Sequence, residues 1–414
     1  MSDSKLPAGW SEKPLGALVS FQKGRKTDTS KNALNGYARY LGASGLSGKD
    51  DGFADMAGAV IAAPSDLLML WDGERSGLVG YMQQGVVAST VSRLTPTDEI
   101  DSAYLYYKLV SLFDWIQARR TGTGVPHVPK DLGKILDIIY PKDTSVQRNI
   151  ATILRTIDNQ IDATQALIEK YTAIKQGMMA DLFSRGIDPE TKALRPTFEE
   201  APELYHKTPL GMLPKGWVCA PIKKFVQSAE YGISTSLNDD SSGIPVLRMN
   251  NIQNNRFNVE DLKFTKDPEA YRLKLSAGDV LYNRTNSMEH VGKTAIWRGE
   301  LSECSFASYL VRINVDEREL LPEYFSFWMS QESSQNALRA FATPAVQQVN
   351  INPTNLQRVL MSCPVSLLEQ QEIVDRIDAV DAVILREREA LLKLNAQKSG
   401  LMQDLLTGKV PVPA

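Results

Sequence analysis

Short clusters of arginine, asparagine, glutamine and serine are the residues of this chain best suited to chemistry. Guanidinium and amide groups carry paired hydrogen-bond donors or acceptors, which suits arginine to guanine and asparagine or glutamine to adenine. In the second half of the chain the candidates for direct contacts with bases or phosphates are Arg248, Asn250, Asn251, Arg284, Asn286, Ser287, Gln347, Gln348 and Asn350. In the first half they are Lys23, Arg25, Lys26, Ser44, Arg75 and Ser76. Asparagine and serine also cap turns, and arginine also pairs with carboxylates, so a structural role is the alternative for each.

Sequence patterns for covalent or metal chemistry are missing. There is no GxxxxGK[ST], HExxH or GxSxG motif, and the three histidines stand alone. Asn352-Pro353-Thr354 departs at its third residue from the Asn-Pro-Pro-Phe/Tyr motif of amino-methyltransferases. The sequence therefore predicts a non-catalytic chain with no metal and no cofactor of its own.

Composition and cysteine usage favour a cytoplasmic protein. Three widely spaced cysteines form no disulfide framework and no zinc motif, which fits a reducing compartment. No signal peptide and no bilayer-spanning apolar run is predicted. The net charge of −3 and the pI of about 5.8 count against a protein that binds DNA alone. Either the basic residues gather on one face, or other subunits contact the phosphates.

The chain contains a long internal repeat. Leu6-Pro-Ala-Gly-Trp10 returns as Leu213-Pro-Lys-Gly-Trp217, and the run Lys175–Leu182 returns as Lys398–Leu405. Two tandem copies are typical of two similar modules about a pseudo-two-fold axis. Such a protein suits a partner with two similar ends, and duplex DNA is one.

A stripe of apolar residues at heptad spacing occurs in each half and predicts a helix of roughly 40 residues, about 60 Å long. Its members are Ile150, Leu154, Ile157, Ile161 and Ile168 in the first half, and Ile373, Ile377, Val380, Ile384 and Leu391 in the second. Because the two stripes are in register, we expect the helices to bury them against each other as an antiparallel pair. Pro141 and Pro364 stand just upstream of the helices, and Gly186 and Gly408 near their ends.

The parts before the long helices are predicted to be mixed α/β domains of the α+β class. Short β-branched and aromatic runs indicate strands, and one helix recurs at Ser102 and at Pro322. We expect globular domains at 1–142 and 213–364 and long helices at 143–186 and 365–407. A polar, proline-bearing linker is expected at 187–212 and a tail at 408–414.

The ordered motifs resemble the DNA-specificity subunits of type I restriction–modification enzymes over nearly the whole chain. The residues that carry the resemblance are Leu213–Trp217, Gly243–Ile252, Gly278–Ser287, Val291–Lys293 and Pro364–Ile373. The first copy departs from this pattern, with Gly42-Ala-Ser-Gly45 in place of Arg248–Asn251 and Asp72-Gly-Glu-Arg75 in place of Asn283–Asn286.

The resemblance implies two target-recognition domains separated by a pair of long antiparallel coiled-coil helices in a pseudo-two-fold internal repeat. Each domain would read one half of a bipartite, interrupted site in double-stranded DNA. The helices would fix the gap and bind two modification subunits, which carry S-adenosylmethionine and methylate adenine at N6. Two restriction subunits would add ATP- and Mg-dependent translocation and cleavage, and no membrane is implied.

Two other functions compete with this one. A coiled-coil adaptor with two protein-binding heads would also have heptads and an acidic pI. Salt-dependent binding of the chain to duplex DNA separates the two functions, because an adaptor makes no phosphate contacts. A fused methyltransferase would need cofactor and catalytic motifs, and would bind S-adenosylmethionine by itself.

Overall fold

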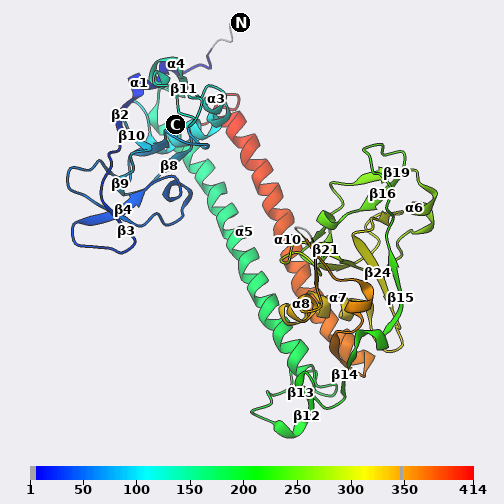
Figure 1. The fold of residues 1–414 in the computed structure, drawn as a ribbon. Helices are drawn as coiled ribbons and strands as arrows, with labels where there is room; N and C mark the ends of the chain where they lie inside the picture. The colour runs from blue at the N-terminus through cyan, green and yellow to red at the C-terminus, as the bar shows by residue number, and fades with distance from the viewer. Residues whose placement is uncertain (1–5, 346–347) are drawn as a thin grey trace. The chain divides into compact units, whose positions relative to one another are not determined.

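The computed structural model describes residues 6–345 and 348–414, and its chain divides into two compact units. Unit 1 ends at Leu167 and also contains Glu387–Ala414, while unit 2 is Ile168–Arg386. Each unit holds one globular domain, part of the long helix that follows that domain, and part of the other long helix (Figure 1). The units therefore divide each long helix between them, which the predicted domain boundaries did not anticipate.

The domain of unit 1 is built on two antiparallel-rich sheets and a separate strand pair. The four-stranded sheet has the order β2 (Val19–Lys23), β10 (Val91–Pro96), β7 (Leu67–Leu70), β8 (Val79–Tyr81). The five-stranded sheet has the order β3 (Thr29–Ser30), β5 (Phe53–Asp55), β4 (Tyr37–Leu41), β9 (Gly85–Val87), β6 (Ile61–Ala62), and β4 and β9 are parallel. The strand pair consists of β1 (Trp10–Pro14) and β11 (Asp137–Pro141).

Unit 2 repeats this topology. Its four-stranded sheet has the order β15 (Val226–Tyr231), β24 (Leu310–Val315), β20 (Val280–Asn283), β22 (Thr294–Ile296). A three-stranded sheet has the order β19 (Lys263–Thr265), β16 (Ile244–Leu247), β23 (Ser305–Phe306), and β16 and β23 are parallel, as β4 and β9 are. The strand pair is β14 (Trp217–Pro221) with β27 (Leu360–Pro364). Unit 2 adds the pairs β12 (Tyr205–Thr208)–β13 (Gly211–Pro214) and β17 (Ile252–Gln253)–β18 (Arg256–Phe257), and the sheet β21 (Thr285–Asn286), β26 (Gln348–Asn350), β25 (Thr343–Ala345).

Both units also contain short helices. Unit 1 has α1 (Leu15–Leu18), α2 (Ser102–Ser111), α3 (Phe113–Gln117), α4 (Leu132–Ile135) and the 3-10 turn η1 (Gly45–Ser47). Unit 2 has α6 (Pro268–Arg272), α7 (Pro322–Ser330), α8 (Glu332–Arg339), α9 (Pro353–Leu356) and the 3-10 turns η2 (Pro202–Leu204), η3 (Ile222–Lys224) and η4 (Met249–Asn251). These elements confirm the predicted α+β class and internal repeat, including the helices expected at Ser102 and Pro322.

Two equivalent glycines show how closely the repeat is kept. A Cβ atom added to Gly24, after β2, would lie 2.1 Å from the carbonyl oxygen of Ala88. A Cβ added to Gly232, after β15, would lie 2.3 Å from the carbonyl oxygen of Phe306. Both positions need glycine because neighbouring backbone fills the space of any side chain.

The two long helices are α5 (Thr144–Arg185) and α10 (Leu367–Leu405). Gly186 (φ 63°) directly follows α5, and Gly408 (φ 72°) lies three residues after the end of α10; a glycine with positive φ is common at helix C-termini. No helix among residues 6–345 and 348–414 is long and apolar enough to cross a membrane.

A buried glutamine fastens the first turn of each long helix to its domain. Gln147 donates from Nε2 to the carbonyl oxygens of Pro141 (2.7 Å) and Glu99 (3.0 Å), and its Oε1 accepts the N–H of Asp101 at 2.7 Å. Gln370 makes the three equivalent hydrogen bonds in unit 2. The repeat thus includes one buried glutamine in each unit. Its three hydrogen bonds fix the position at which the long helix leaves its domain.

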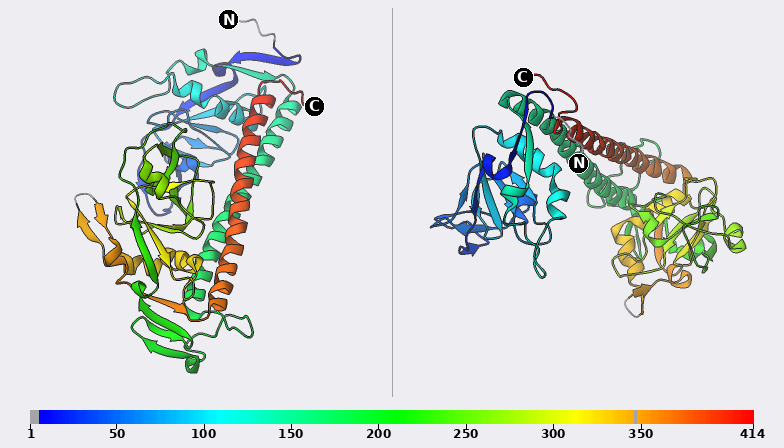
Figure 2. Two further views of the ribbon diagram at one scale, coloured as in Figure 1. Left: turned by 90° about the vertical axis from the view of Figure 1, so that its right-hand side faces the viewer. Right: turned by 90° about the horizontal axis from the view of Figure 1, so that it is seen from above.

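Within each unit, α5 and α10 lie side by side and antiparallel (Figure 2). In unit 1 Lys398 pairs with Asp158 at 2.6 Å, and in unit 2 Lys175 pairs with Asp381 at 2.7 Å. The two ion pairs join equivalent residues of the two copies, and Asp158 also accepts a hydrogen bond from Tyr107 at 2.7 Å.

Most of the predicted heptad stripe is buried. Seven of its ten members are at most 6% exposed, namely Ile150, Leu154, Ile157, Ile168, Ile373, Ile377 and Ile384. Ile161, Val380 and Leu391 are half-buried. Ile150 and Leu154 also belong to the core of the unit 1 domain, and Ile373 and Ile377 to that of unit 2. The stripe therefore packs on the domains as well as on the partner helix, which the sequence prediction did not include.

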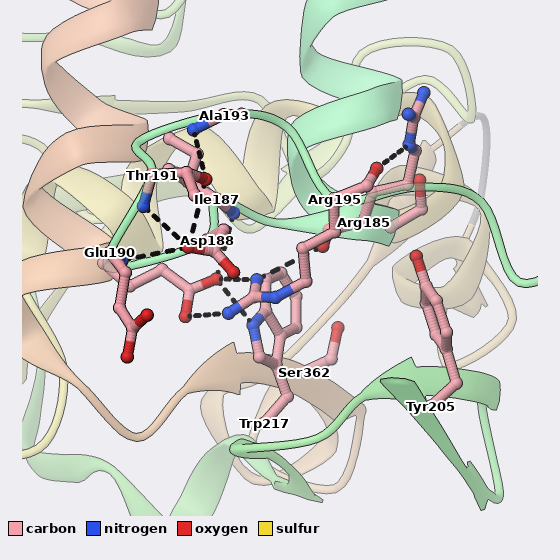
Figure 3. Close-up of polar contacts among 12 residues, drawn as sticks. Arg185, Ile187, Asp188, Glu190, Thr191, Ala193, Arg195, Tyr205, Trp217 and Ser362 are labelled. Carbon is pink, nitrogen blue, oxygen red and sulfur yellow. Dashed lines mark hydrogen bonds and ion pairs between the residues drawn. The ribbon is translucent and has the colours of Figure 1, made fainter. Parts of the chain in front are cut away.

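The segment predicted as a linker, 187–212, is folded within unit 2. Arg195 forms a buried ion pair with Glu369, with Nη2 to Oε2 at 2.9 Å, and Trp217 donates from Nε1 to Glu369 at 2.9 Å. Figure 3 shows Arg195 and Trp217 converging from this segment and from β14. The segment expected to be a linker therefore packs within unit 2, because a carboxylate from far along the chain holds it in place.

Candidate nucleic-acid interface

Three equivalent segments in each unit together hold twelve of the fifteen sequence-predicted contacts, and we call them the variable segments. They lie at the C-terminal ends of β2, β4 and β7 in unit 1 and of β15, β16 and β20 in unit 2. They are 23–26, 42–45 and 71–76 in unit 1, and 231–233, 248–251 and 284–287 in unit 2.

Matched backbone hydrogen bonds show that these segments are equivalent. Trp71 donates its N–H to the carbonyl of Thr90 at 2.7 Å, and Arg284 donates in the same way to Tyr309 at 3.0 Å. The N–H groups of Ala88 and Ala307 likewise bind the last residues of β4 and β16. The backbone scaffold is therefore the same in both units while the side chains differ.

In unit 1, an ionic network joins the first and third variable segments. Lys23 pairs with Asp72 at 2.9 Å, and Nδ1 of His127 lies 2.7 Å from the other oxygen of that carboxylate. Burial raises the pKa of Asp72, but hydrogen bonds from Lys23 and His127 outweigh that effect and lower it below its usual value. The lysine charge is thus partly compensated, although the side chain stays exposed.

The remaining unit 1 candidates lie around this network. Arg75 donates to Ser47 at 3.1 Å and to the carbonyl of Ala43 at 3.2 Å, which joins the third segment to the second. Arg25 and Lys26 are exposed, and Ser44 is half-buried at the N-cap of η1. Four cations therefore gather on the variable segments of unit 1.

Ser76 does not belong to this surface. Its side chain is fully buried and its hydroxyl has no hydrogen-bond partner among the described residues. A side chain with no exposed atoms cannot reach a base edge, so Ser76 is withdrawn as a candidate contact.

In unit 2, Arg284 joins the first and third variable segments. Its Nε donates to the carbonyl of Ser308 at 2.8 Å, and its guanidinium carbon lies 4.9 Å from the ring centroid of Tyr231. Tyr231 and Tyr309 are 47% and 46% exposed, which leaves two aromatic rings open to solvent beside an arginine. Exposed aromatic rings are a common element of nucleic-acid contact surfaces.

The second variable segment of unit 2 is more constrained than expected. Arg248 forms an ion pair with Asp261 at 2.8 Å, and Asn250 donates to the same carboxylate at 3.4 Å. Asn251 is 2% exposed and its amide binds the backbone of Arg248, Asn258 and Asp261. Asn251 therefore stabilises the turn, and its prediction as a base contact is corrected.

Residues Thr343–Ala345 and Gln348–Asn350 form the strands β25 and β26. Strand β26 pairs with β21, and Asn350 donates to the hydroxyl of Thr285 at 2.7 Å. Gln348 is exposed, whereas Gln347 lies outside the described residues. The hairpin brings Gln348 and Asn350 to the strand that carries Asn286.

Asn286 and Ser287 complete the third segment of unit 2. Asn286 is half-buried, accepts the N–H of Ser287 at 2.8 Å, and lies 3.6 Å from the sulfur of Met249. Ser287 is exposed. The exposed Tyr231, Tyr309 and Met288 were not among the sequence-predicted contacts, although Tyr231 stands at the strand end equivalent to that of Lys23.

Comparisons with known proteins were made for sequence and for structure. The sequence model of the family described as "Type I restriction modification DNA specificity domain" matches residues 7–172 and 214–395. The type I restriction enzyme MjaVIII specificity subunit of Methanocaldococcus jannaschii is 26% identical over 100% of this chain and 95% of its own length. The EcoKI specificity subunit of Escherichia coli is 22% identical over 99% of this chain and 91% of its own length.

Among solved structures, the S subunit of a type I restriction–modification system from M. genitalium aligns with a TM-score of 0.63 at 13% identity, covering 100% of this chain and 99% of that one. A chain from a study of complex assembly in the type I R-M system aligns with a TM-score of 0.54 at 16% identity, covering 98% and 100%. These likenesses concern the fold, and the twice-repeated family match covers most of the chain. This protein therefore belongs to the DNA-specificity subunits of type I restriction–modification systems.

Proposed function

We propose that the chain reads a bipartite, interrupted site in double-stranded DNA, with each unit reading one half. The observation that carries this proposal is the pairing of one repeated backbone scaffold with two different sets of side chains. At equivalent positions unit 1 has Lys23 and Trp71, while unit 2 has Tyr231 and Arg284. Two copies of one scaffold with different donors and acceptors suit two different half-sites joined in one target.

The chain supplies recognition and its partners supply chemistry. We infer that two modification subunits bind the long helices, carry S-adenosylmethionine and methylate adenine at N6. Two restriction subunits then add ATP- and Mg-dependent translocation and cleavage, in the cytoplasm. The net charge of −3 supports shared binding, because partner subunits would provide much of the phosphate contact.

The test compares the purified chain alone with the chain co-purified with its modification subunit, on a library of DNA duplexes. The chain alone should bind weakly and transfer no methyl groups, while the complex should bind selectively and methylate adenine. Binding should weaken steeply with salt because phosphate contacts release counterions. Salt-independent partner binding without DNA affinity would support a protein adaptor instead, and methyl transfer by the isolated chain would contradict a non-catalytic role.

A further inference from the structure

We infer that Arg284 binds a guanine in the half-site read by unit 2, and that Tyr231 is the positioning residue that orients its guanidinium group. This inference rests on the proposed function and adds the chemistry of one base position. It concerns a single side chain whose surroundings in unit 2 differ from those of the other arginines nearby.

Both the backbone and the side chain of Arg284 are held. Its N–H donates to Tyr309 at 3.0 Å and its carbonyl accepts the N–H of Ile351 at 2.8 Å. Its Nε donates to Ser308 at 2.8 Å, and the ring of Tyr231 lies against the guanidinium. A group fixed in this way loses little further entropy when it binds a ligand.

The two terminal amino groups of Arg284 remain available. Neither forms a hydrogen bond with any residue in 6–345 or 348–414, and neither is among the buried polar atoms that lack a partner. They are therefore open to solvent as a pair of parallel donors. In the major groove, guanine presents two adjacent acceptors, O6 and N7, to which an arginine can donate both.

Neighbouring arginines are already occupied by carboxylates. Arg248 is paired with Asp261 at 2.8 Å, and Arg312 with Asp279 at 2.9 Å. Arg284 has no carboxylate partner among the described residues and instead stacks on a neutral ring. Its charge is therefore not neutralised by a carboxylate, and its two terminal amino groups remain able to donate.

The surroundings favour a base over a phosphate. The variable segments of unit 2 contain only two charged side chains, Arg248 and Arg284, whereas those of unit 1 contain several cations. A surface that binds backbone phosphates is expected to contain many cationic side chains. A single oriented arginine on a segment that also carries the amide of Asn286 has the composition expected for base contacts.

The experiment uses the full chain with its modification subunit and measures the base preference at every position of the methylated sites. Arg284→Gln should relax one guanine in one half-site by about 10- to 100-fold and leave the other half-site unchanged. Tyr231→Leu should relax the same position, while Tyr231→Phe, which keeps the ring, should preserve it. Arg248→Gln is the matched control and should leave that guanine specified.

Several outcomes would overturn the inference. One is a wild-type target in which the half-site altered by unit 2 variants contains no G·C pair. Another is an unchanged profile for both Arg284→Gln and Tyr231→Leu. Uniform weakening on all sequences with a shallower salt dependence would assign Arg284 to a phosphate. A wild-type complex without any sequence preference would instead contradict the proposed function, and if Arg284→Gln did not assemble, the Tyr231 pair would decide the inference.

Discussion

Glu369 of α10 holds the folded connecting segment of unit 2 in place. It is 4% exposed, and its oxygens accept hydrogen bonds from Ile187, Arg195 and Trp217. Ile187 and Arg195 belong to the connecting segment, and Trp217 belongs to β14. Removing one member of a buried ion pair is strongly destabilising, because the remaining charge is left buried without a partner.

We expect Glu369→Ala to lower the free energy of unfolding of the full chain by about 3–5 kcal/mol, because it leaves a buried guanidinium unpaired. Chemical denaturation measures this. The matched control is Glu372→Ala, three residues along α10, whose partly exposed pair with Lys192 should contribute less than about 1 kcal/mol. Equal effects of the two substitutions would show that the Glu369 network contributes no special stability.

Lys108 gives the stability of unit 1 a pH dependence. Burial lowers the pKa of Lys108 to about 8, and its ammonium group donates to the carbonyl of Leu406 at 2.8 Å. Since the unfolded lysine keeps its proton up to about pH 10.4, the unfolded state binds more protons between pH 8 and 10.4. Stability should therefore rise across this window, by up to about 3 kcal/mol from this group.

The comparison with Lys108→Met isolates this effect from other groups that titrate at alkaline pH. The stability of the wild type relative to the variant should be constant below pH 8 and should increase from pH 8 to 10.4. A difference that stays flat over that window would mean that Lys108 is not desolvated.

At the scale of residues, the sequence could not predict which candidate side chains are exposed to solvent. Arginine and asparagine were identified by type, but exposure depends on residues distant in the chain. Asn251 is buried because its amide binds the backbone of Asn258 and Asp261, and Ser76 is buried where Gln117 of α3 binds its carbonyl. The strand-end position of Tyr231 can be read from the sequence, but its contact with Arg284 cannot.

At the scale of elements, the long helices were the most predictable part. Their heptad period is local, and glycines stop both of them, so α5 and α10 end within two residues of the predicted bounds. The hairpin β25–β26 was missed because it depends on pairing with β21, more than fifty residues earlier in the chain.

Ile157 tests the packing of the stripe. It is 4% exposed, so Ile157→Asp would bury an unpaired charge and should destabilise the chain by more than about 3 kcal/mol and abolish assembly with the modification subunit. The control is Ala163→Asp, an exposed position on the same helix. Thermal unfolding and co-purification measure both variants, and a stable, assembling Ile157→Asp chain would refute the packing.

At the scale of the whole molecule, the two long helices connect the two units, and we propose that they set the gap between the half-sites. An insertion just beyond Ser184 would disturb the buried network of Glu369, to which Gly186, Ile187 and Arg195 belong. The insertion should instead fall between the units, after Leu167 in α5 and after Arg386 in α10.

Four residues inserted at both points add about 6 Å of helix at about 1.5 Å per residue. One base pair advances duplex DNA by about 3.4 Å, so the recognised gap should lengthen by about one or two base pairs while both half-sites stay the same. Methylated-site sequencing checks this, with the same four residues added after Pro413 as the control. An active insertion variant that keeps the original gap would contradict the role of the helices as spacers.

The central claim is that one chain reads two half-sites. Mapping every N6-methyladenine in the genome of cells that carry this chain and its modification subunit tests that claim most directly. The predicted result is one motif with two specified half-sites of different sequence, separated by an unspecified gap of constant length. A single uninterrupted motif, or methylation without sequence preference, would contradict it.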